Sequence, residues 1–270
     1  MLAAFARRVR SGSAGGARLI MACLVDEEHT FLGVQHFVAN KVHQSLGGPV
    51  DAVVAEPTQM RIVKAHKGVA RWGVTTLGRA CHSSRPEMGV NAIYHMAKVL
   101  PVIEAYAEEL RRSKIDPDLG PATLSVGRVE GGASVNTVPD FCRLDIDRRL
   151  IPGEEGEKSR LEFINYLRQR VEGVDLECSE LFLNCPALGE IEGTAGLIHR
   201  LGDAIVSVQG NYEVEVVPYG TDASSLSLAG VPSVVFGPGN IASAHTKDES
   251  ISLDEVEQAS EILYRLACMG

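Results

Sequence analysis

Three consecutive carboxylates, Asp26, Glu27 and Glu28, directly follow the apolar run Leu19 to Val25. The run is typical of a buried strand, and a carboxylate at the end of such a strand loses hydration. It must then be paired, hydrogen-bonded or bound to a cation. In an open α/β sheet, ligands also bind at the carboxyl ends of strands. An isolated acidic triplet is more often a solvated junction, so its role depends on the residues that accompany it.

Two more potential metal ligands follow expected strand ends. Glu56 comes after the apolar run 50–55, and His245 follows the run 231–236 through Gly237-Pro238-Gly239-Asn240. Carboxylate oxygen together with imidazole nitrogen suits zinc, cobalt or manganese. No cysteine lies among these residues, which favours an open catalytic site over a closed structural zinc site. Each residue alone would be interpreted as solvated, and their shared position at strand ends is what indicates a site.

The elements that must position these residues are strands and helices that alternate at both ends of the chain. Apolar, β-branched runs predict strands at 19–25, 50–55, 214–217 and 231–236. Helical patterns lie between or after them, at 33–44, 195–208 and 252–269. The last of these begins with the capping pattern Ser252-Leu253-Asp254-Glu255. The alternation predicts an α/β domain with a mostly parallel sheet that is covered on both faces.

The middle of the chain has a different pattern. Apolar residues alternate loosely from Ile62 to Gly78, as in a half-exposed strand pair, and two further strands are expected at 123–129 and 141–147. Helices are expected at 91–110 and 158–171. Two helices beside an antiparallel sheet form a small α+β layer. We therefore predict an inserted domain at residues 62–177, and a catalytic domain formed by residues 1–61 and 178–270.

Composition and charge limit the classes of function. The chain has 270 residues, 45% of them apolar, which is enough for two moderate cores. A formal net charge of -9 without a long basic run argues against nucleic acid or an anionic membrane surface as partner. The six cysteines contain no Cys-x-x-Cys pair, so we expect a reduced, cytoplasmic protein. Residues 1–10 are basic, as in a transit peptide, but we interpret them as an amphipathic helix.

The ordered motifs of the chain resemble the metal-dependent amidohydrolases and peptidases that include acetylornithine deacetylase, succinyl-diaminopimelate desuccinylase, aminoacylase and carboxypeptidase G. The resemblance covers nearly the whole chain, and it depends on the number and order of motifs that would each be weak alone. They are Asp26-Glu27-Glu28 with Gly33, Glu56-Pro57-Thr58, Lys67-Gly68, Gly78 with His82-Ser83-Ser84 and Pro86, Gly89-Val90-Asn91-Ala92, Gly131-Gly132 with Asn136-Thr137-Val138-Pro139, Asp145-Ile146-Asp147-Arg148-Arg149 with Pro152-Gly153, Gly220-Thr221-Asp222, and Gly237-Pro238-Gly239 with Ala244-His245-Thr246.

The resemblance implies a zinc-exopeptidase-like catalytic domain that holds two zinc ions, or cobalt or manganese in their place. Glu27 matches the general base of the family, with Asp26 as its support. Glu28 and His245 match ligands of one metal, and Glu56 a ligand of the other. A metal lowers the pKa of bound water from 15.7 to about 7, and an adjacent unligated carboxylate can take the proton as the water attacks an amide carbonyl.

The resemblance also makes the inserted domain a lid and a homodimerisation unit. His82 matches a histidine that reaches the active site of the partner subunit and stabilises the developing oxyanion. Asn136 matches a polar lid residue that contacts the substrate. Without the resemblance, His82 would be interpreted as the end of a strand and Asn136 as part of a turn.

Three further residues match the family's recognition of a substrate carboxylate. Arg149 matches an arginine that binds this carboxylate, a task suited to a planar bidentate donor. Gly220 and Thr221 match a loop that binds the same group through its backbone and hydroxyl. We expect Arg148, beside Arg149, to be a solvated charge.

The chain departs from the family pattern at its start. Family members carry a His-x-Asp motif and a metal-bridging Asp upstream of the glutamate pair, and this chain has neither. His29, His36 and His43 follow the triplet, and we expect them on a solvent-facing helix. We therefore expect a catalytic sheet that is incomplete at its N-terminus. We also expect weak or absent binding of two zinc ions, because two close cations repel strongly without an anion between them.

Several functions stay open on the sequence alone. The leading hypothesis is hydrolysis of the amide bond of an N-acyl amino acid, such as N-acetylornithine or N-succinyl-diaminopimelate, in amino-acid and arginine biosynthesis. We expect the absent ligands to impair it. Alternatives are a metallo-dipeptidase, a non-catalytic truncated relative that dimerises or binds a small ligand, and a carrier or binding protein that never used metal.

Overall fold

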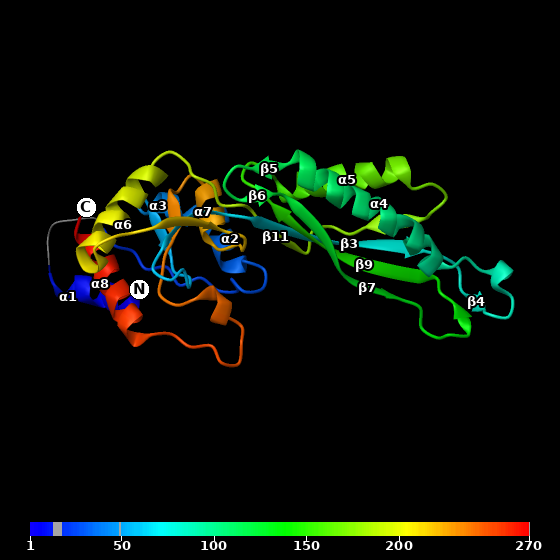
Figure 1. Cartoon of the computed structure of the whole chain (residues 1–270), viewed down its shortest axis with the longest axis horizontal. Helices are drawn as coiled ribbons and strands as arrows, with labels where there is room; N and C mark the ends of the chain where they lie inside the picture. The colour runs from blue at the N-terminus through cyan, green and yellow to red at the C-terminus, as the bar shows by residue number, and fades with distance from the viewer. Residues whose placement is uncertain (13–17, 49, 270) are drawn as a thin grey trace. The chain divides into compact units, whose positions relative to one another are not determined.

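The computed structural model of the chain describes residues 1–12, 18–48 and 50–269 (Figure 1). The chain forms two compact units. Met1–His66 and Leu188–Gly270 make up the first, which we call the outer unit, and Lys67–Ala187 make up the second, the inserted unit. In the described part of the chain, no helix is both long enough and apolar enough to cross a membrane.

The outer unit is built on a four-stranded sheet in the order β1-β13-β2-β12. Its strands are β1 (Ala52–Val54), β2 (Ile62–His66), β12 (Val214–Val217) and β13 (Ser233–Val235). β1 runs parallel to β13 and β12 runs parallel to β2, whereas β13 and β2 are antiparallel. The sheet is mostly parallel, as predicted. Because β1 and β13 are parallel, the segments that follow them leave the sheet at the same end.

Helices cover both faces of this sheet. The helices of this unit are α1 (Leu2–Arg10), α2 (Leu32–Ala39), α3 (Val42–Ser45), α6 (Thr194–Gln209), α7 (Ala223–Leu228), α8 (Leu253–Cys268) and the 3-10 helix η2 (Ile241–Ser243), of which α6, α7 and α8 pack on the sheet. α6 and α8 pack on Ile62 and Val234, whereas Ala223 of α7 packs on Val63 and Val235. Successive strand residues point to opposite faces, so α7 lies on the face opposite α6 and α8. Ser252 caps α8 as predicted, since its Oγ accepts the Glu255 N–H at 3.4 Å.

The run 19–25, predicted as a buried strand, forms no strand in the structure. Val25 is 67% exposed, and Leu19 and Ile20 are also exposed. A strand needs a neighbour that satisfies its backbone N–H and C=O groups. Within the described residues the sheet ends at β1, which pairs with β13 alone, so the run stays irregular and the prediction is wrong.

The helix predicted at 33–44 is divided into α2 and α3. The chain changes direction at Lys41, where φ is 53°. Because of this turn, His43 is directed inwards and is buried, beside the ring of Phe37 at a centroid distance of 6.5 Å. The expectation that His29, His36 and His43 all face solvent is wrong for His43.

The inserted unit is an antiparallel sheet in the order β10-β3-β9-β7, with β11 also paired to β3. The strands are β3 (Gly68–Leu77), β7 (Thr123–Gly131), β9 (Phe141–Leu150), β10 (Leu176–Cys178) and β11 (Leu183–Cys185). Shorter elements are β4 (Cys81–His82) with β8 (Thr137–Val138), β5 (Ile115–Asp116) with β6 (Gly120–Pro121), and the 3-10 helix η1 (Pro86–Met88).

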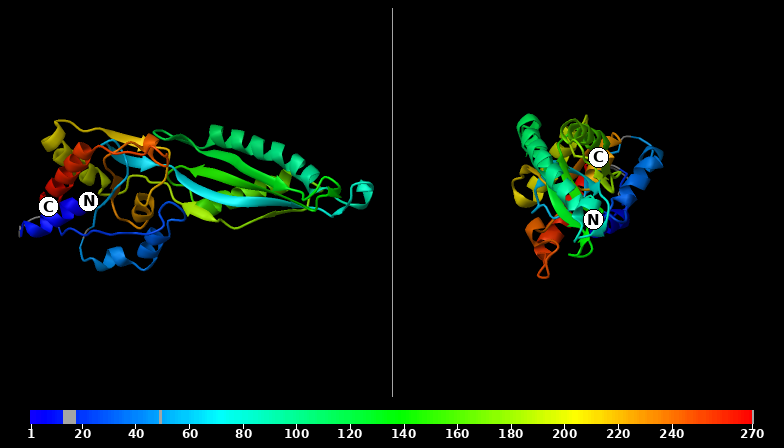
Figure 2. Two further views of the ribbon diagram at one scale, coloured as in Figure 1. Left: turned by 90° about the horizontal axis from the view of Figure 1, so that it is seen from below. Right: turned by 90° about the vertical axis from the view of Figure 1, so that its right-hand side faces the viewer.

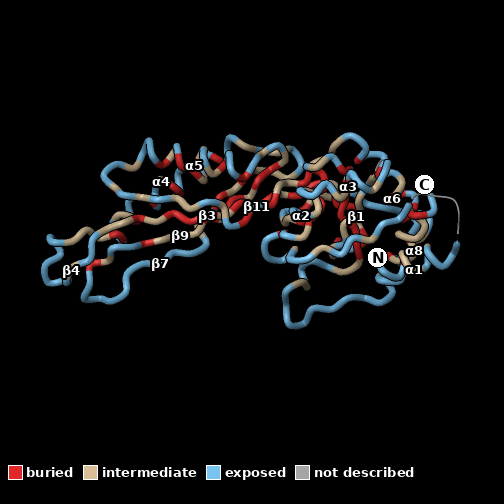
Figure 3. Tube along the Cα trace, turned by 180° about the vertical axis from the view of Figure 1, so that it is seen from behind, coloured by how far each residue is buried: buried red, intermediate tan, exposed pale blue. Residues whose placement is uncertain are grey.

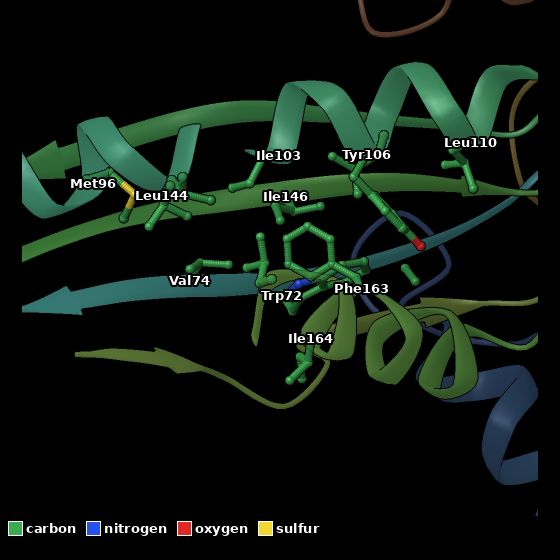
Figure 4. Close-up of a cluster of buried hydrophobic side chains, with 14 of the residues drawn as sticks. Trp72, Val74, Met96, Ile103, Tyr106, Leu110, Leu144, Ile146, Phe163 and Ile164 are labelled. Carbon is green, nitrogen blue, oxygen red and sulfur yellow. The ribbon is translucent and has the colours of Figure 1, made fainter. Parts of the chain in front are cut away.

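Two helices, α4 (Ala92–Ser113) and α5 (Gly156–Arg170), cover one face of this sheet (Figure 2). The core between them contains Trp72 of β3, Tyr106 of α4 and Phe163 of α5, and Phe163 lies 5.4 Å from each of the other two rings (Figure 4). Buried residues alternate along β9 and recur on the inner faces of both helices (Figure 3). The predicted pair of helices beside an antiparallel sheet is therefore present.

The strand pair predicted over 62–78 is divided between the two units. β2 pairs with β12 and β13 in the sheet of the outer unit, whereas β3 starts the sheet of the inserted unit. The structural division therefore falls after His66 and before Leu188, later along the chain than the predicted bounds of 62 and 177. Loose alternation cannot show which of two sheets supplies the neighbour of a strand.

Candidate functional site

The acidic triplet lies in a tight turn that leads into α2. Asp26 has a φ of 65°, and its carbonyl oxygen accepts the N–H groups of Thr30 and Phe31 at 3.2 and 2.8 Å. The Thr30 hydroxyl donates to the Asp26 carboxylate. Asp26 therefore closes the turn that carries Glu27 and Glu28.

Glu28 and His245 contact each other although 217 positions separate them in the sequence. The His245 Nε2 atom lies 3.0 Å from Glu28 Oε2 and 3.1 Å from Oε1. Both side chains are largely exposed, at 71% for Glu28 and 73% for His245. The hydrogen bond with Glu28 and the charge of that carboxylate raise the pKa of His245. The structure thus brings together two residues predicted to bind the same metal.

Glu56 follows β1 and lies against the segment that leads from β13 to His245. A Cβ atom placed on Gly237 would lie 2.5 Å from the Glu56 carbonyl oxygen, so only glycine allows this approach. The Thr58 N–H also donates to the Gly237 carbonyl at 3.3 Å. These contacts fix Glu56 beside the chain that carries His245.

Glu27 and Glu56 are half-buried carboxylates that repel each other. Burial raises the pKa of Glu27 to about 7, and the negative charges of Asp222 and Glu28 add to this rise. Burial likewise raises the pKa of Glu56 to about 7, followed by the charges of Glu27, Glu28 and Asp222. The structure therefore gathers four carboxylates from three separate segments, in a place where a positive charge would be stabilised.

Asp222 is a member of this acidic cluster to which the sequence analysis gave no role. It is 8% exposed, and burial raises its pKa to about 6. It is the third residue of the motif Gly220-Thr221-Asp222. An aspartate before a helix is ordinarily interpreted as an N-cap, which conceals any other role.

Gly220 and Thr221 form a loop that a buried histidine holds. The His66 Nε2 atom accepts the Thr221 N–H at 3.2 Å and lies 3.0 Å from the Thr221 Oγ1. That Oγ1 in turn accepts the Ala223 N–H at 3.2 Å. The hydroxyl predicted to bind a substrate carboxylate is buried and engaged within the protein. No role was predicted for His66. Its signal in the sequence is that a polar residue stands at the end of an apolar strand.

The structure brings His82 and Asn136 together in the inserted unit. β4 and β8 pair with His82 opposite Thr137, and the Ser83 N–H donates to the Asn136 carbonyl at 3.0 Å. His82 Nδ1 lies 2.8 Å from Ser84 Oγ. Both predicted residues are exposed.

Arg149 lies at the other end of the same sheet. It is opposite Val69 on β3, whereas His82 follows the end of β3 at which Leu77 pairs with Phe141. At about 3.3 Å per residue, the distance along β3 from Val69 to Leu77 is about 26 Å. The Arg149 Nε donates to Asp147 Oδ1 at 2.7 Å. One copy of the chain therefore cannot bring His82 and Arg149 to one small ligand.

Arg148 is fully buried, so the expectation of a solvated charge is wrong. It occupies an inward position in the alternation of β9, and its Nη2 donates to Glu154 Oε1 at 2.7 Å. The Lys114 Nζ lies 3.1 Å from the same oxygen. The pattern Arg148-Arg149 does not reveal which arginine points inwards, because that depends on the register of β9.

Comparison with known proteins shows which proteins this chain resembles. Residues 64–175 match the model of a peptidase dimerisation domain. An acetylornithine deacetylase of Myxococcus xanthus is 29% identical over 259 residues, which cover 92% of this chain and 64% of that protein. An acetylornithine deacetylase of Vibrio atlanticus is 30% identical over 248 residues, which cover 91% of this chain and 63% of that protein.

The chain is similar to acetylornithine deacetylases over most of its length. It spans less than two thirds of the length of the curated relatives that it matches. Solved structures show the same fold in other proteins. An aminopeptidase from Bacillus cereus superposes with a TM-score of 0.67 at 19% identity, over 90% of this chain and 62% of that one. A tripeptidase from Staphylococcus aureus gives 0.65 at 18% identity, over 88% and 62%.

The predicted fold of the chain is confirmed, with an α/β unit and an inserted α+β unit. Its donor atoms suit a divalent cation in kind, since carboxylate oxygens and one imidazole nitrogen gather at one place. Among the described residues, the buried Oδ1 of Asp222 has no hydrogen-bond partner, and a bound cation would compensate its charge. In the described parts of the chain, however, no three such side chains are placed to hold a metal together. Cation binding would therefore require these side chains to rearrange.

Proposed function

We propose that this protein is a member of the metal-dependent amidohydrolases that hydrolyses the amide bond of N-acyl amino acids, of the acetylornithine deacetylase or succinyl-diaminopimelate desuccinylase type. The observation that carries the proposal is the contact between Glu28 and His245 beside the half-buried Glu27 and Glu56. The acetylornithine deacetylases that cover most of the chain support the substrate class. A metallo-dipeptidase shares this chemistry and is distinguished by substrate.

The residues have separate roles in this proposal. Glu28 and His245 would hold one zinc ion and Glu56 a second, with cobalt or manganese as replacements. The cations supply Lewis-acid activation of a water molecule and of the amide carbonyl. Glu27 accepts the proton of the attacking water and donates it to the leaving amine. A half-buried carboxylate whose pKa is raised towards neutrality suits a group that must do both.

Substrate binding is assigned to Arg149, Asn136 and the loop of Gly220 and Thr221. Arg149 would bind the free carboxylate of the substrate after release from Asp147. Because Thr221 is held by His66, the loop would contribute its backbone more readily than the hydroxyl. The separation of His82 from Arg149 supports a homodimer, in which His82 of the partner subunit completes each site. Such a protein would act in the cytoplasm.

We also propose that two zinc ions bind weakly to the 270-residue chain. Glu28, His245 and Glu56 are only part of the ligand set of a dizinc centre. The first two are exposed and bound to each other, so cation binding must compete with their own contact. Impaired catalysis follows, because the activated water depends on the cation.

The test is zinc titration of the purified chain by calorimetry, combined with hydrolysis assays on N-acetylornithine, N-succinyl-diaminopimelate and a dipeptide. We expect one or two weak sites, and Glu28→Gln and His245→Ala should each remove the site that these two residues hold. His199→Ala is the control, because His199 is exposed and pairs with Asp203 at 3.1 Å. Two tight zinc sites would contradict the proposed weakness. Cation binding without hydrolysis of any substrate would favour a non-catalytic relative, and zinc affinity unchanged in both variants would exclude the metal site.

A further inference from the structure

Asp222 has the position of a helix cap but does not act as one. It is the N-cap residue of α7, where an aspartate side chain usually accepts the N–H of the second or third helical residue. Here the carboxylate makes no such bond. The Thr221 Oγ1 accepts the Ala223 N–H instead, at 3.2 Å. The Asp222 carboxylate is therefore free for another task.

One oxygen of the Asp222 carboxylate is buried without a hydrogen-bond partner among the described residues. The residue is 8% exposed, and Oδ1 has no hydrogen-bond partner in the part of the chain that the structure describes. Burying a charged oxygen in this way is strongly unfavourable unless a cation or a donor compensates it. The fold nevertheless keeps Asp222 in this position, because the next residue, Ala223, packs in the core with Val63 and Val235.

The surroundings of Asp222 are negative. Val235 ends β13 and pairs with Val54, the last residue of β1. Glu56 follows Val54 by two residues, so it lies at the same end of the sheet. The charge of Asp222 acts on both Glu27 and Glu56. His245 acts on them in the opposite sense, but it is exposed and already paired with Glu28. The charge of Asp222 thus acts on two other carboxylates, and among the described residues its buried Oδ1 has no hydrogen-bond donor.

We propose that Asp222 is a cation-binding residue, whose buried oxygen binds a divalent cation beside Glu56. The inference rests on the proposed metal site and adds to it a residue that neither the motif pattern nor the capping rule indicates. A site with oxygen ligands from Glu56 and Asp222 suits Mn²⁺ as well as Zn²⁺. The cation removes the unfavourable charge that the metal-free fold carries at this place.

The experiment measures Mn²⁺ binding to the 270-residue chain by the loss of the free-ion electron paramagnetic resonance signal, with Zn²⁺ as competitor. Asp222→Asn keeps the shape of the side chain and removes its charge, and Asp222→Ser keeps a capping group. We expect both to weaken Mn²⁺ binding at least tenfold. Asp203→Asn is the charge-matched control, because Asp203 is exposed, and its affinity should equal that of the wild type.

Thermal unfolding separates a ligand from a structural residue. If Asp222 is a ligand, Asp222→Asn relieves repulsion in the metal-free protein, so its Tm stays equal or rises while the Mn²⁺-induced increase in Tm is lost. A fall in Tm with Mn²⁺ affinity within twofold of the wild type would overturn the inference and show a structural role.

Glu56→Gln distinguishes this result from a failure of the proposed function. If Glu56→Gln loses the cation and both Asp222 variants keep it, the metal site stands and the role of Asp222 falls. If the wild type itself binds neither cation, the proposed metal site and this inference fall together.

Discussion

The Nε2 atom of His66 accepts the backbone N–H of Thr221 at 3.2 Å and lies 3.0 Å from its hydroxyl oxygen. Both residues are buried, and 155 positions separate them. The contact ties the end of β2 to the loop that precedes α7. The Gly220–Thr221 loop therefore has a defined shape before any ligand binds.

Replacing the acceptor in this contact should destabilise the protein. His66→Phe leaves the buried Thr221 N–H without its acceptor, and we expect the free energy of unfolding to fall by about 1–3 kcal/mol. His66→Gln offers an amide oxygen in a similar place and should lose less. Urea denaturation measures the free energy of unfolding of both variants. Combining each of them with Thr221→Val gives the coupling energy between the side chains at positions 66 and 221. Equal losses for Phe and Gln would show that packing, and not the hydrogen bond, matters at this position.

The metal-free protein should lose stability as the pH rises. The folded-state pKa values of Glu27 and Glu56 are raised from 4.5 to about 7, so between these values the folded state binds more protons than the unfolded state. The free energy of unfolding then decreases with rising pH in this window. His245 acts in the same direction, because its pKa is also raised.

Thermal unfolding at pH 5 and pH 8 in the presence of a chelator tests this prediction. We expect the higher Tm at pH 5, and a smaller difference in the double variant Glu27→Gln, Glu56→Gln. Saturating Zn²⁺ should also reduce the difference, since a cation stabilises the ionised carboxylates. A wild-type Tm that rises from pH 5 to pH 8 with chelator present would contradict the raised pKa values.

The buried Arg148 and Glu154 should respond unequally to substitution. Glu154→Gln leaves the fully buried Arg148 charge uncompensated, and breaking such a pair costs about 3–5 kcal/mol. Arg148→Met leaves Glu154 with Lys114 at 3.1 Å, so the loss should be smaller. Chemical denaturation gives both values, with Glu108→Gln on the exposed face of α4 as control. A larger loss for Arg148→Met would show that Lys114 does not hold Glu154.

A site shared between two copies predicts complementation. Glu27→Gln and His82→Ala should each be inactive as homodimers. In a mixed dimer, the His82→Ala subunit keeps Glu27 and receives His82 of the partner subunit. Random mixing then restores about a quarter of the wild-type sites, because half of the dimers are mixed and each has one complete site.

Hydrolysis of N-acetylornithine by the mixture, under conditions where the wild type is active, measures this recovery. The matched control is a mixture of Glu27→Gln with Glu28→Gln. Both residues lie in the same unit of the chain, so a mixed dimer has no complete site if the two residues of one subunit act in the same site. No recovery from the first mixture, with mixed dimers demonstrated by mass spectrometry, would exclude the shared site.

Local patterns in the sequence determined most of the elements. The strand at 214–217 and the Ser252 cap were predicted as they occur, and α6 differs from its predicted span by one residue at each end. Apolar periodicity and capping depend on residues only a few positions apart, so they can be identified without a fold. The ordered motifs also indicated the resemblance to metal-dependent amidohydrolases, and with it Glu28 and His245 as candidate ligands.

Only the tertiary structure decided which of these residues are buried and which meet. It places β2 in the outer sheet, leaves 19–25 without a strand partner, and buries Arg148 and Asp222. It also joins His66 to Thr221 and Glu28 to His245 across more than half of the chain. Burial and pairing depend on the segments that pack around a residue, and those segments come from distant parts of the sequence. For this reason the acidic triplet predicted a site, whereas the buried carboxylate of Asp222 could be recognised only in the fold.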